Sequence, residues 1–135
     1  MVQVTASYQG EKHCEVQHGP SGSLLETDAP VDNDGKGERF SPTDLMGAAL
    51  STCILTVMSI VAERDGVDLR GTRVEVEKHM VTNPRRIGRL PAKVYFIEGI
   101  TKDYRAKLER TARTCPVHES LRADIEAPIE FIYPD

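Results

Sequence analysis

Several features that the sequence lacks exclude whole classes of protein. The 135-residue chain has a net charge of −4 with both signs interspersed, so it offers no basic field to a nucleic acid. Its first residues, MVQVTASYQ, contain neither a charged n-region nor an apolar h-region, so nothing in them marks export. Three cysteines, an odd number, argue against a secreted disulfide scaffold. We therefore expect a cytoplasmic protein, in which a disulfide is more readily catalytic or regulatory than structural.

The longest apolar stretch, residues 41–65, predicts one long central helix. Ser41 is a suitable N-cap, Pro42 fits the first helical position, and Asp44 completes a Ser-x-x-Asp capping box. Gly66 follows as a stop signal. Apolar side chains cover nearly the whole circumference of this helix, so we expect it to be buried on most sides.

The uncharged part of this helix, residues 45–62, is just long enough to raise the alternative of a membrane span. Serines, threonines and small residues interrupt it, and no basic flank sets an orientation. A helix buried in a soluble protein is therefore the better interpretation, and we expect no association with a membrane.

The rest of the chain alternates short strand patterns with turns and with further helical patterns. The expected elements are, in chain order, a β-meander over residues 1–27, a loop over 28–40, the central helix over 41–65, a β-hairpin of strands 72–81 and 92–100, a helix pair over 101–123, and a strand over 128–133. This order predicts an α+β fold, with mostly antiparallel sheets packed around the long central helix. At this length we expect a single domain of residues 1–135.

Two cysteines lie in informative surroundings. Cys53 is near the middle of the apolar helix, where burial alone explains a cysteine as a small inert hydrophobe. If Pro116 begins a new helix, Cys115 is its N-cap, and the backbone amides and helix dipole there favour the thiolate and lower its pKa. His118, one turn onward, is placed to assist as a cation, although a solvated histidine is as common at a helix start. Cys14 lies on a short strand without a neighbouring cysteine, and we interpret it as incidental.

Two loops invite a functional interpretation that their composition supports only weakly. Arg85, Arg86 and Arg89 form a small basic cluster in the turn of the expected hairpin. Such a cluster is usually solvated surface, and docking of an anionic partner is the alternative. The loop of residues 28–40 is rich in Gly, Asp and Asn but matches no phosphate-binding loop, so we interpret it as a connector.

Two segments together resemble a known family. The helix start SPTDLMGAALSTC, followed past a strand hairpin by a helix and CPVHESL, resembles the OsmC/Ohr family of thiol-dependent peroxidases. The lead-in GKGERFSPTDL is similar to the shorter OsmC-like branch. The resemblance covers essentially the whole chain in element order. It implies an intertwined homodimer, with the long central helices of two subunits packed together and a site at the interface in each half.

The resemblance also implies a chemistry for the two cysteines. Cys53 would be the peroxidatic thiolate, which attacks the distal oxygen of an organic hydroperoxide and becomes a sulfenic acid. Cys115 would resolve it as an intrasubunit Cys53–Cys115 disulfide. An external dithiol, such as a lipoyl protein or thioredoxin, would reopen that bond, so no cofactor or metal is expected. The role implied by the family is defence against oxidative stress.

The chain departs from the family's pattern in one pair of residues. Well-studied peroxidases of the family place an arginine from an N-terminal loop beside the peroxidatic cysteine, held by a glutamate in the first turn of the long helix. No arginine precedes Arg39 here, so Arg39 is the candidate cation, and Glu38 is the candidate to orient it. Thr43 and Asp44 occupy the matching helix turn, where Asp44 is the candidate acid.

Two alternative functions remain open from the sequence. One is a redox-responsive or small-molecule-binding protein of the same fold without efficient peroxidase turnover, which the changed arginine–acid pair favours. The other is a metal site of Cys53, Cys115 and His118, whose side chains are ligand types that zinc accepts. The absence of a Cys-x-x-Cys pair makes this second signal weak.

Overall fold

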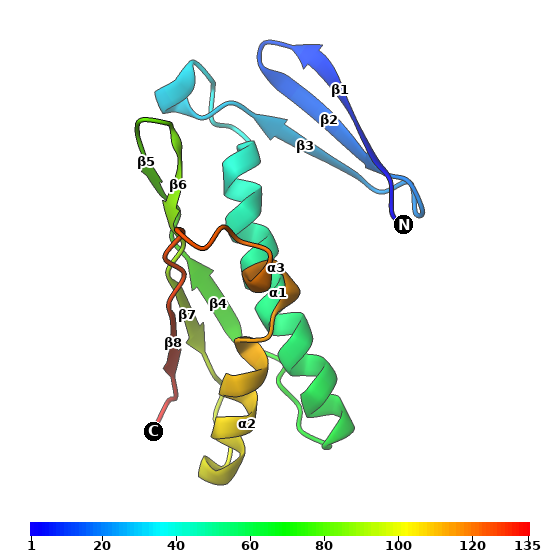
Figure 1. The fold of residues 1–135 in the computed structure, drawn as a ribbon. Helices are drawn as coiled ribbons and strands as arrows, with labels where there is room; N and C mark the ends of the chain where they lie inside the picture. Colours follow the sequence, from blue (N-terminus) through cyan, green and yellow to red (C-terminus); the bar gives the residue numbers. More distant parts are fainter. The chain divides into compact units, whose positions relative to one another are not determined.

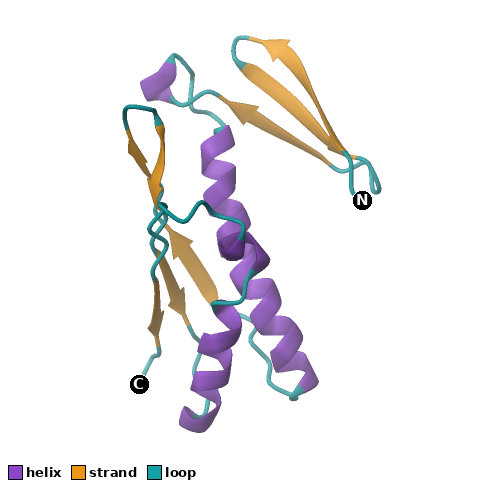
Figure 2. Cartoon of the chain, viewed as in Figure 1, coloured by secondary structure: helices purple, strands orange, loops and turns teal.

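The computed structural model describes residues 1–135 and has the α+β architecture that the sequence predicts (Figure 1). Figure 2 separates the helices, strands and loops of the same view. The chain forms two compact units, Met1–Met46 and Gly47–Asp135. The expectation of a single domain over the whole chain stays a prediction.

The N-terminal unit is built on a three-stranded antiparallel meander. Its strands are β1 (Val4–Gly10), β2 (His13–His18) and β3 (Leu24–Asp28). Tyr8 pairs with Cys14 across β1 and β2, and Cys14 pairs with Thr27 across β2 and β3, so these side chains share one face of the sheet. The apolar side chains on the same face are those of Val4, Ala6, Val16 and Leu25. Much of this apolar face is open, because Tyr8 is 68% exposed and Val4 is 62% exposed.

The loop after β3 closes on itself before the long helix begins. The amide of Asp28 donates to the carbonyl oxygen of Phe40 at 3.1 Å, so the chain enters and leaves the loop at one place. A short 3-10 turn, Val31–Asn33, lies inside it. The loop corresponds to the connector expected over residues 28–40, and it fixes where Arg39 is presented.

The long helix, α1, covers Pro42–Arg64 and begins with the predicted capping box. The amide of Asp44 donates to Ser41 Oγ at 3.0 Å, and the amide of Ser41 donates to Asp44 Oδ2 at 2.9 Å. Two amides that the first helical turn leaves without backbone acceptors are thereby satisfied. The Asp44 carboxylate also lies at the positive end of the helix dipole.

The far end of α1 is closed by Gly66, as predicted. Gly66 has a φ of +72°, and the amide of Val67 donates back to the carbonyl of Ala62 at 2.8 Å. The expectation that α1 is buried on most sides is wrong for the single chain, because only one side of the helix has elements packed against it. The buried stripe consists of Gly47, Leu50, Ile54, Met58 and Ala62. By length and composition α1 is also apolar enough to cross a membrane, a test that core helices of soluble proteins pass as well.

The C-terminal unit contains a small mixed sheet and a separate hairpin. The sheet has the order β4 (Arg73–Val76), β7 (Ala92–Tyr95), β8 (Ile129–Ile132), and the hairpin consists of β5 (His79–Val81) and β6 (Arg86–Arg89). Strands β4 and β7 are antiparallel, whereas β7 and β8 are parallel. The predicted long strands 72–81 and 92–100 are therefore wrong in detail. Pro91, which has no amide to donate, separates β6 from β7, and a turn at Gly99 with a φ of +91° ends the extended chain early.

One apolar core joins this sheet to α1 and to α2 (Lys102–Ala112), and Figure 1 shows both helices on the same side of the sheet. Ile54 and Met58 from α1, Val94 from β7 and Leu108 from α2 are fully buried within it. Leu108 and Ala112 of α2, and Cys115 just beyond its end, are fully buried in the same core. A last short helix, α3 (Pro116–Glu119), follows directly and brings Cys115 to the edge of this core.

Candidate functional site

Cys53 and Cys115, the two cysteines predicted to react, lie together in the C-terminal unit. Cys53 is in the middle of α1, and Cys115 occupies the junction of α2 and α3. Their thiols lie close enough for Cys53 to raise the pKa of Cys115, and both are free rather than joined in a disulfide. Cys115 is fully buried, whereas Cys53 is only partly buried. A reagent that arrives from solvent therefore meets Cys53 first.

Cys115 is the N-cap of α3, as the sequence predicts. Pro116 follows at the start of the helix, and Cys115 Sγ accepts the amide of His118 at 3.5 Å. The predicted lowering of its pKa is wrong, because burial raises the pKa of the Cys115 thiol and its hydrogen bond with Cys53 raises it further. The amides of His118 and Val117 lower the pKa without outweighing burial. Cys115 is therefore a protonated thiol at neutral pH, suited to donate its hydrogen.

His118 contributes its backbone, and not its ring, to the cysteine pair. Its Nε2 lies 2.9 Å from the carbonyl oxygen of Ala127. Because a carbonyl oxygen only accepts, Nε2 carries a hydrogen in this contact, which ties α3 to the segment before β8. No group of three or more His, Cys, Asp and Glu side chains is arranged to hold a metal ion, so the alternative of a Cys53–Cys115–His118 metal site gains no geometric support.

Arg39, the candidate cation, belongs to the N-terminal unit and is bound by Glu26 of β3. Its Nε donates to Glu26 Oε2 at 3.3 Å, and its Nη1 donates to the main-chain carbonyl of Glu38 at 3.4 Å. Glu38 is the predicted partner of this arginine, but only its main-chain carbonyl contacts Arg39, whereas the carboxylate that binds Arg39 comes from Glu26. The ion pair with Glu26 lowers the pKa of that carboxyl, after the larger influence of His13.

Thr43 and Asp44, the other candidates from the first turn of α1, both contact Ser41. The Asp44 carboxylate accepts the Ser41 amide, and Thr43 Oγ1 lies 3.2 Å from Ser41 Oγ. These contacts explain an acidic residue at this position by helix capping. A catalytic role for Asp44 or Thr43 stays a prediction.

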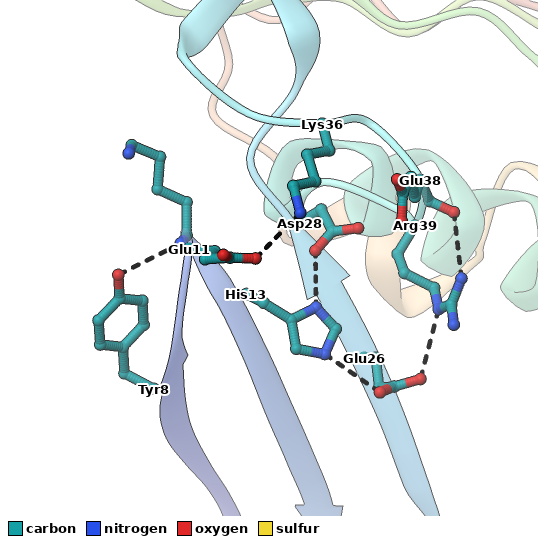
Figure 3. A network of polar contacts seen from close by, with 9 residues as sticks. Tyr8, Glu11, His13, Glu26, Asp28, Lys36, Glu38 and Arg39 are labelled. Carbon is teal, nitrogen blue, oxygen red and sulfur yellow. Dashed lines mark hydrogen bonds and ion pairs between the residues drawn. The ribbon is translucent and has the colours of Figure 1, made fainter.

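Sequence reasoning missed the residues that hold Glu26 and Arg39 in place (Figure 3). His13 Nδ1 lies 2.6 Å from Asp28 Oδ1, and His13 Nε2 lies 3.1 Å from Glu26 Oε1. Glu26 and Asp28 are two residues apart and therefore share one face of β3, and the register places His13 opposite Asp28. Period-two alternation alone would have grouped the two acids, but their histidine partner depends on the register.

The remaining candidates are two arginines of the basic cluster and the third cysteine. Arg86 pairs with Asp124 at 3.5 Å, and Arg89 pairs with Glu126 at 2.9 Å, so acidic residues before β8 neutralise this part of the basic cluster. Arg86 and Arg89 lie on β6 rather than in the turn, and their ion pairs favour the interpretation of the cluster as ordinary surface. Cys14 is a free, partly buried thiol on β2.

Comparison with known proteins supplies the family context. A family model described as OsmC-like protein matches residues 35–130. A crystal structure from Psychrobacter arcticus 273-4, provisionally described as an osmotic stress induced and detoxification response protein, is 37% identical, covers 97% of this chain and 96% of its own, and has a TM-score of 0.92. No curated protein matches the chain.

Two more distant structures share the fold. An organic hydroperoxide resistance protein OsmC from Legionella pneumophila is 18% identical over 98% of this chain and 96% of its own, with a TM-score of 0.74. The organic hydroperoxide resistance protein OhrB of Bacillus subtilis is 16% identical over 97% of each chain, with a TM-score of 0.70. At these identities the likeness concerns the fold alone.

Proposed function

Because the chain belongs to the OsmC-like protein family, we propose that it is a cysteine-based hydroperoxide reductase in which Cys53 is peroxidatic and Cys115 resolving. The observation that carries the proposal is the pair of neighbouring free thiols, one partly exposed and one fully buried. Two proteins with this fold are described as organic hydroperoxide resistance proteins, which supports the same class of substrate. The cellular role would be defence against oxidative stress in the cytoplasm.

In the first step the Cys53 thiolate attacks the distal oxygen of the hydroperoxide. A sulfur–oxygen bond forms, the oxygen–oxygen bond breaks, and the leaving alkoxide takes a proton to become an alcohol. Cys53 is then a sulfenic acid, oxidised by two electrons while the hydroperoxide is reduced by two. The raised pKa of Cys115 supports this division of roles, because a protonated neighbour can donate to the Cys53 sulfur and does not compete as a nucleophile.

In the second step the sulfur of Cys115 attacks the sulfur of the Cys53 sulfenic acid. A disulfide forms, and the hydroxyl group leaves with the Cys115 proton as water. An external dithiol, such as a lipoyl protein or thioredoxin, then reduces the Cys53–Cys115 disulfide by two exchange reactions. The protein itself needs no cofactor or metal in this sequence.

We assign the cation of the reaction to Arg39. It is the first arginine of the chain and directly precedes the capped start of α1, which supports a role in the family's arginine position. Glu26 is the carboxylate that holds it, in place of Glu38. The capping contacts of Asp44 support a contribution through the geometry of the helix start, with Thr43 beside it.

We also propose that the protein acts as a homodimer. The apolar side chains Phe40, Met46 and Ile60 are 57%, 39% and 45% exposed in the single chain. Only 28% of the most apolar part of α1 is buried in the single chain. This exposed apolar surface exceeds the scattered apolar residues that are normal on a monomer, and a second copy of the same helix would cover it. Light scattering should give twice the mass of the chain, and Ile60→Glu should shift it toward the monomer.

The experiment that tests the reductase is mass analysis after reaction with tert-butyl hydroperoxide. The reduced protein should lose two hydrogens, mapped to a Cys53–Cys115 link that a dithiol reverses. Cys53→Ser should not react, Cys115→Ser should stop at a sulfenic acid that dimedone traps, and Cys14→Ser should behave as the unchanged protein. If both thiols stay reduced in excess hydroperoxide, the alternative of a redox-responsive or small-molecule-binding protein takes precedence.

A further inference from the structure

His13 lies between two carboxylates at the end of the N-terminal sheet. Its Nδ1 is 2.6 Å from Asp28 Oδ1 and its Nε2 is 3.1 Å from Glu26 Oε1 (Figure 3). An ionised carboxylate only accepts hydrogen bonds, so both ring nitrogens must carry hydrogens for both contacts to exist. The geometry therefore describes an imidazolium and not a neutral ring. In agreement with it, Asp28 first and Glu26 second raise the pKa of His13.

Glu26 connects this imidazolium to Arg39. Its Oε1 faces His13 Nε2, and its Oε2 accepts from Arg39 Nε at 3.3 Å. One carboxylate is thus shared by two cations, each on a different oxygen. This sharing fixes the rotation of the carboxylate more firmly than either contact alone, because both oxygens have an assigned donor.

The backbone beneath this network is also fixed. Asp28, which holds the other side of the His13 ring, closes the loop through its amide bond to the Phe40 carbonyl. The amide of Ala29 donates to the carbonyl of Lys12, next to His13, at 3.2 Å. The start of the segment that carries Arg39 is therefore tied to the residue before His13, and its end is tied to Asp28 of β3.

The other charged groups around the ring do not replace it. Lys36 pairs with Glu11 at 2.9 Å, and Glu38 contacts Arg39 through its main-chain carbonyl. Glu15 shares the ring's face of β2, two residues onward, and the two groups that raise the pKa of His13 are Asp28 and Glu26. His13 is thus the cation placed between the two acids of β3.

We propose that His13, acting through Glu26, is a positioning residue that sets the side chain of Arg39. The proposal rests on the function proposed above, in which Arg39 is the cation of the hydroperoxide reaction. When His13 loses its second proton, one ring nitrogen becomes an acceptor, and one carboxylate contact must open. The longer contact, to Glu26, is the one expected to open, which frees Glu26 to move and leaves Arg39 with a mobile partner.

The first experiment follows the relay without any enzyme assay. The ordinary pKa of histidine is about 6.5. In nitrogen-15 NMR spectra of the full chain, both His13 ring nitrogens should stay protonated at pH values above it. Glu26→Gln and His13→Gln should each shift the Arg39 Nε–H signal, and the matched control His18→Gln, at the far end of β2, should not. An Arg39 signal that is unchanged by both test variants would overturn the relay, whatever the activity of the protein.

The second experiment measures the rate of Cys53 oxidation by tert-butyl hydroperoxide. His13→Gln and Glu26→Gln should each slow it by about two- to fivefold, the range of partly exposed ion pairs, and neither should slow it further in an Arg39→Ala background. The oxidation rate of the unchanged protein divided by that of His13→Gln should be largest at low pH, as long as Glu26 stays ionised. This ratio should approach one as His13 deprotonates. His13→Arg, charged throughout, should restore part of the rate and remove that pH dependence.

The two experiments separate the two proposals. If Cys53 does not react but the Arg39 signal responds as described, the proposed reductase fails while the contact relay stands without a catalytic use. If Cys53 reacts, but His13→Gln and Glu26→Gln slow its oxidation further in the Arg39→Ala background, the reductase stands and the positioning role of His13 is overturned.

Discussion

Cys115 lies close enough to Cys53 for that thiol to raise its pKa, although the two residues come from different helices. The contact arises because α2 continues the packing of its inward face, Leu108 and Ala112, to its very end and delivers Cys115 against α1. The same packing buries Cys115 and raises its pKa, while Cys53 keeps part of its surface. One packing arrangement thus makes two chemically similar side chains different in their access to solvent.

This difference predicts the order in which the thiols are alkylated. In the reduced native protein, iodoacetamide should modify Cys53 faster than Cys115, because Cys115 is fully buried and that burial raises its pKa and lowers its thiolate fraction. Peptide mass analysis of a time course measures both rates, and unfolding in guanidinium chloride should bring them together. Equal rates in the native state would contradict the burial of Cys115.

What the sequence predicts well here is local. The start of α1 could be predicted because Ser41 and Asp44 satisfy each other's amides within one turn, and Cys115 could be predicted as an N-cap because Pro116 follows it. Sequence favoured a lowered pKa for Cys115 because the helix amides are local signals, whereas the burial that outweighs them comes from residues distant in the chain.

The parts that sequence did not predict depend on pairing between segments. His13 meets Asp28 only because β2 and β3 adopt one register, and a shift of one residue would turn His13 to the other face. The apolar circumference of α1 predicted burial on most sides, yet a single chain supplies neighbours for one stripe. Whether a second copy covers the rest cannot be read from the periodicity of one helix.

The capping box predicts a stability effect at Ser41. Ser41→Ala removes the acceptor for the Asp44 amide and should lower the free energy of unfolding by about 1 kcal/mol, within a range of about 0.5–2. Ser41→Gly, which lets water reach the same amide, should cost only a few tenths of a kcal/mol. Denaturant titration measures both. If Asp44→Ala matches Ser41→Ala in stability but alone abolishes hydroperoxide reduction, Asp44 has a catalytic role beyond capping.

The core beneath the cysteine pair predicts a larger effect at Leu108. Leu108 is fully buried between α1 and the sheet, so Leu108→Ala should lower the free energy of unfolding by about 2–5 kcal/mol through lost burial and the cavity that remains. Leu108→Met nearly conserves the volume and should cost less than about 1.5 kcal/mol. Denaturant titration compares them, and similar losses for the two variants would show that volume at this position does not matter.

The contact between the ends of α1 and α2 predicts a dependence on acid pH. Asp65 Oδ2 accepts from Lys107 Nζ at 2.6 Å and from Tyr104 Oη at 2.7 Å, and these contacts lower the pKa of Asp65, with Lys107 the larger influence. A carboxyl whose pKa is lower in the folded state stabilises the fold above its ordinary pKa of about 4, and this contribution is lost as pH falls through the folded-state value.

Asp65→Asn should therefore be less stable than the unchanged protein at pH 7, and the difference should shrink steadily below about pH 4. Glu63→Gln, which alters an exposed carboxylate on the same turn of α1, is the matched control and should show a smaller difference at pH 7. Denaturant titrations at a series of pH values measure both. Asp65→Asn should also lower the pKa of Tyr104, which burial first and Asp65 second raise to about 12. The absorbance of the phenolate band measures that pKa. A stability difference that is constant with pH would mean that Asp65 acts through packing and not through its charge.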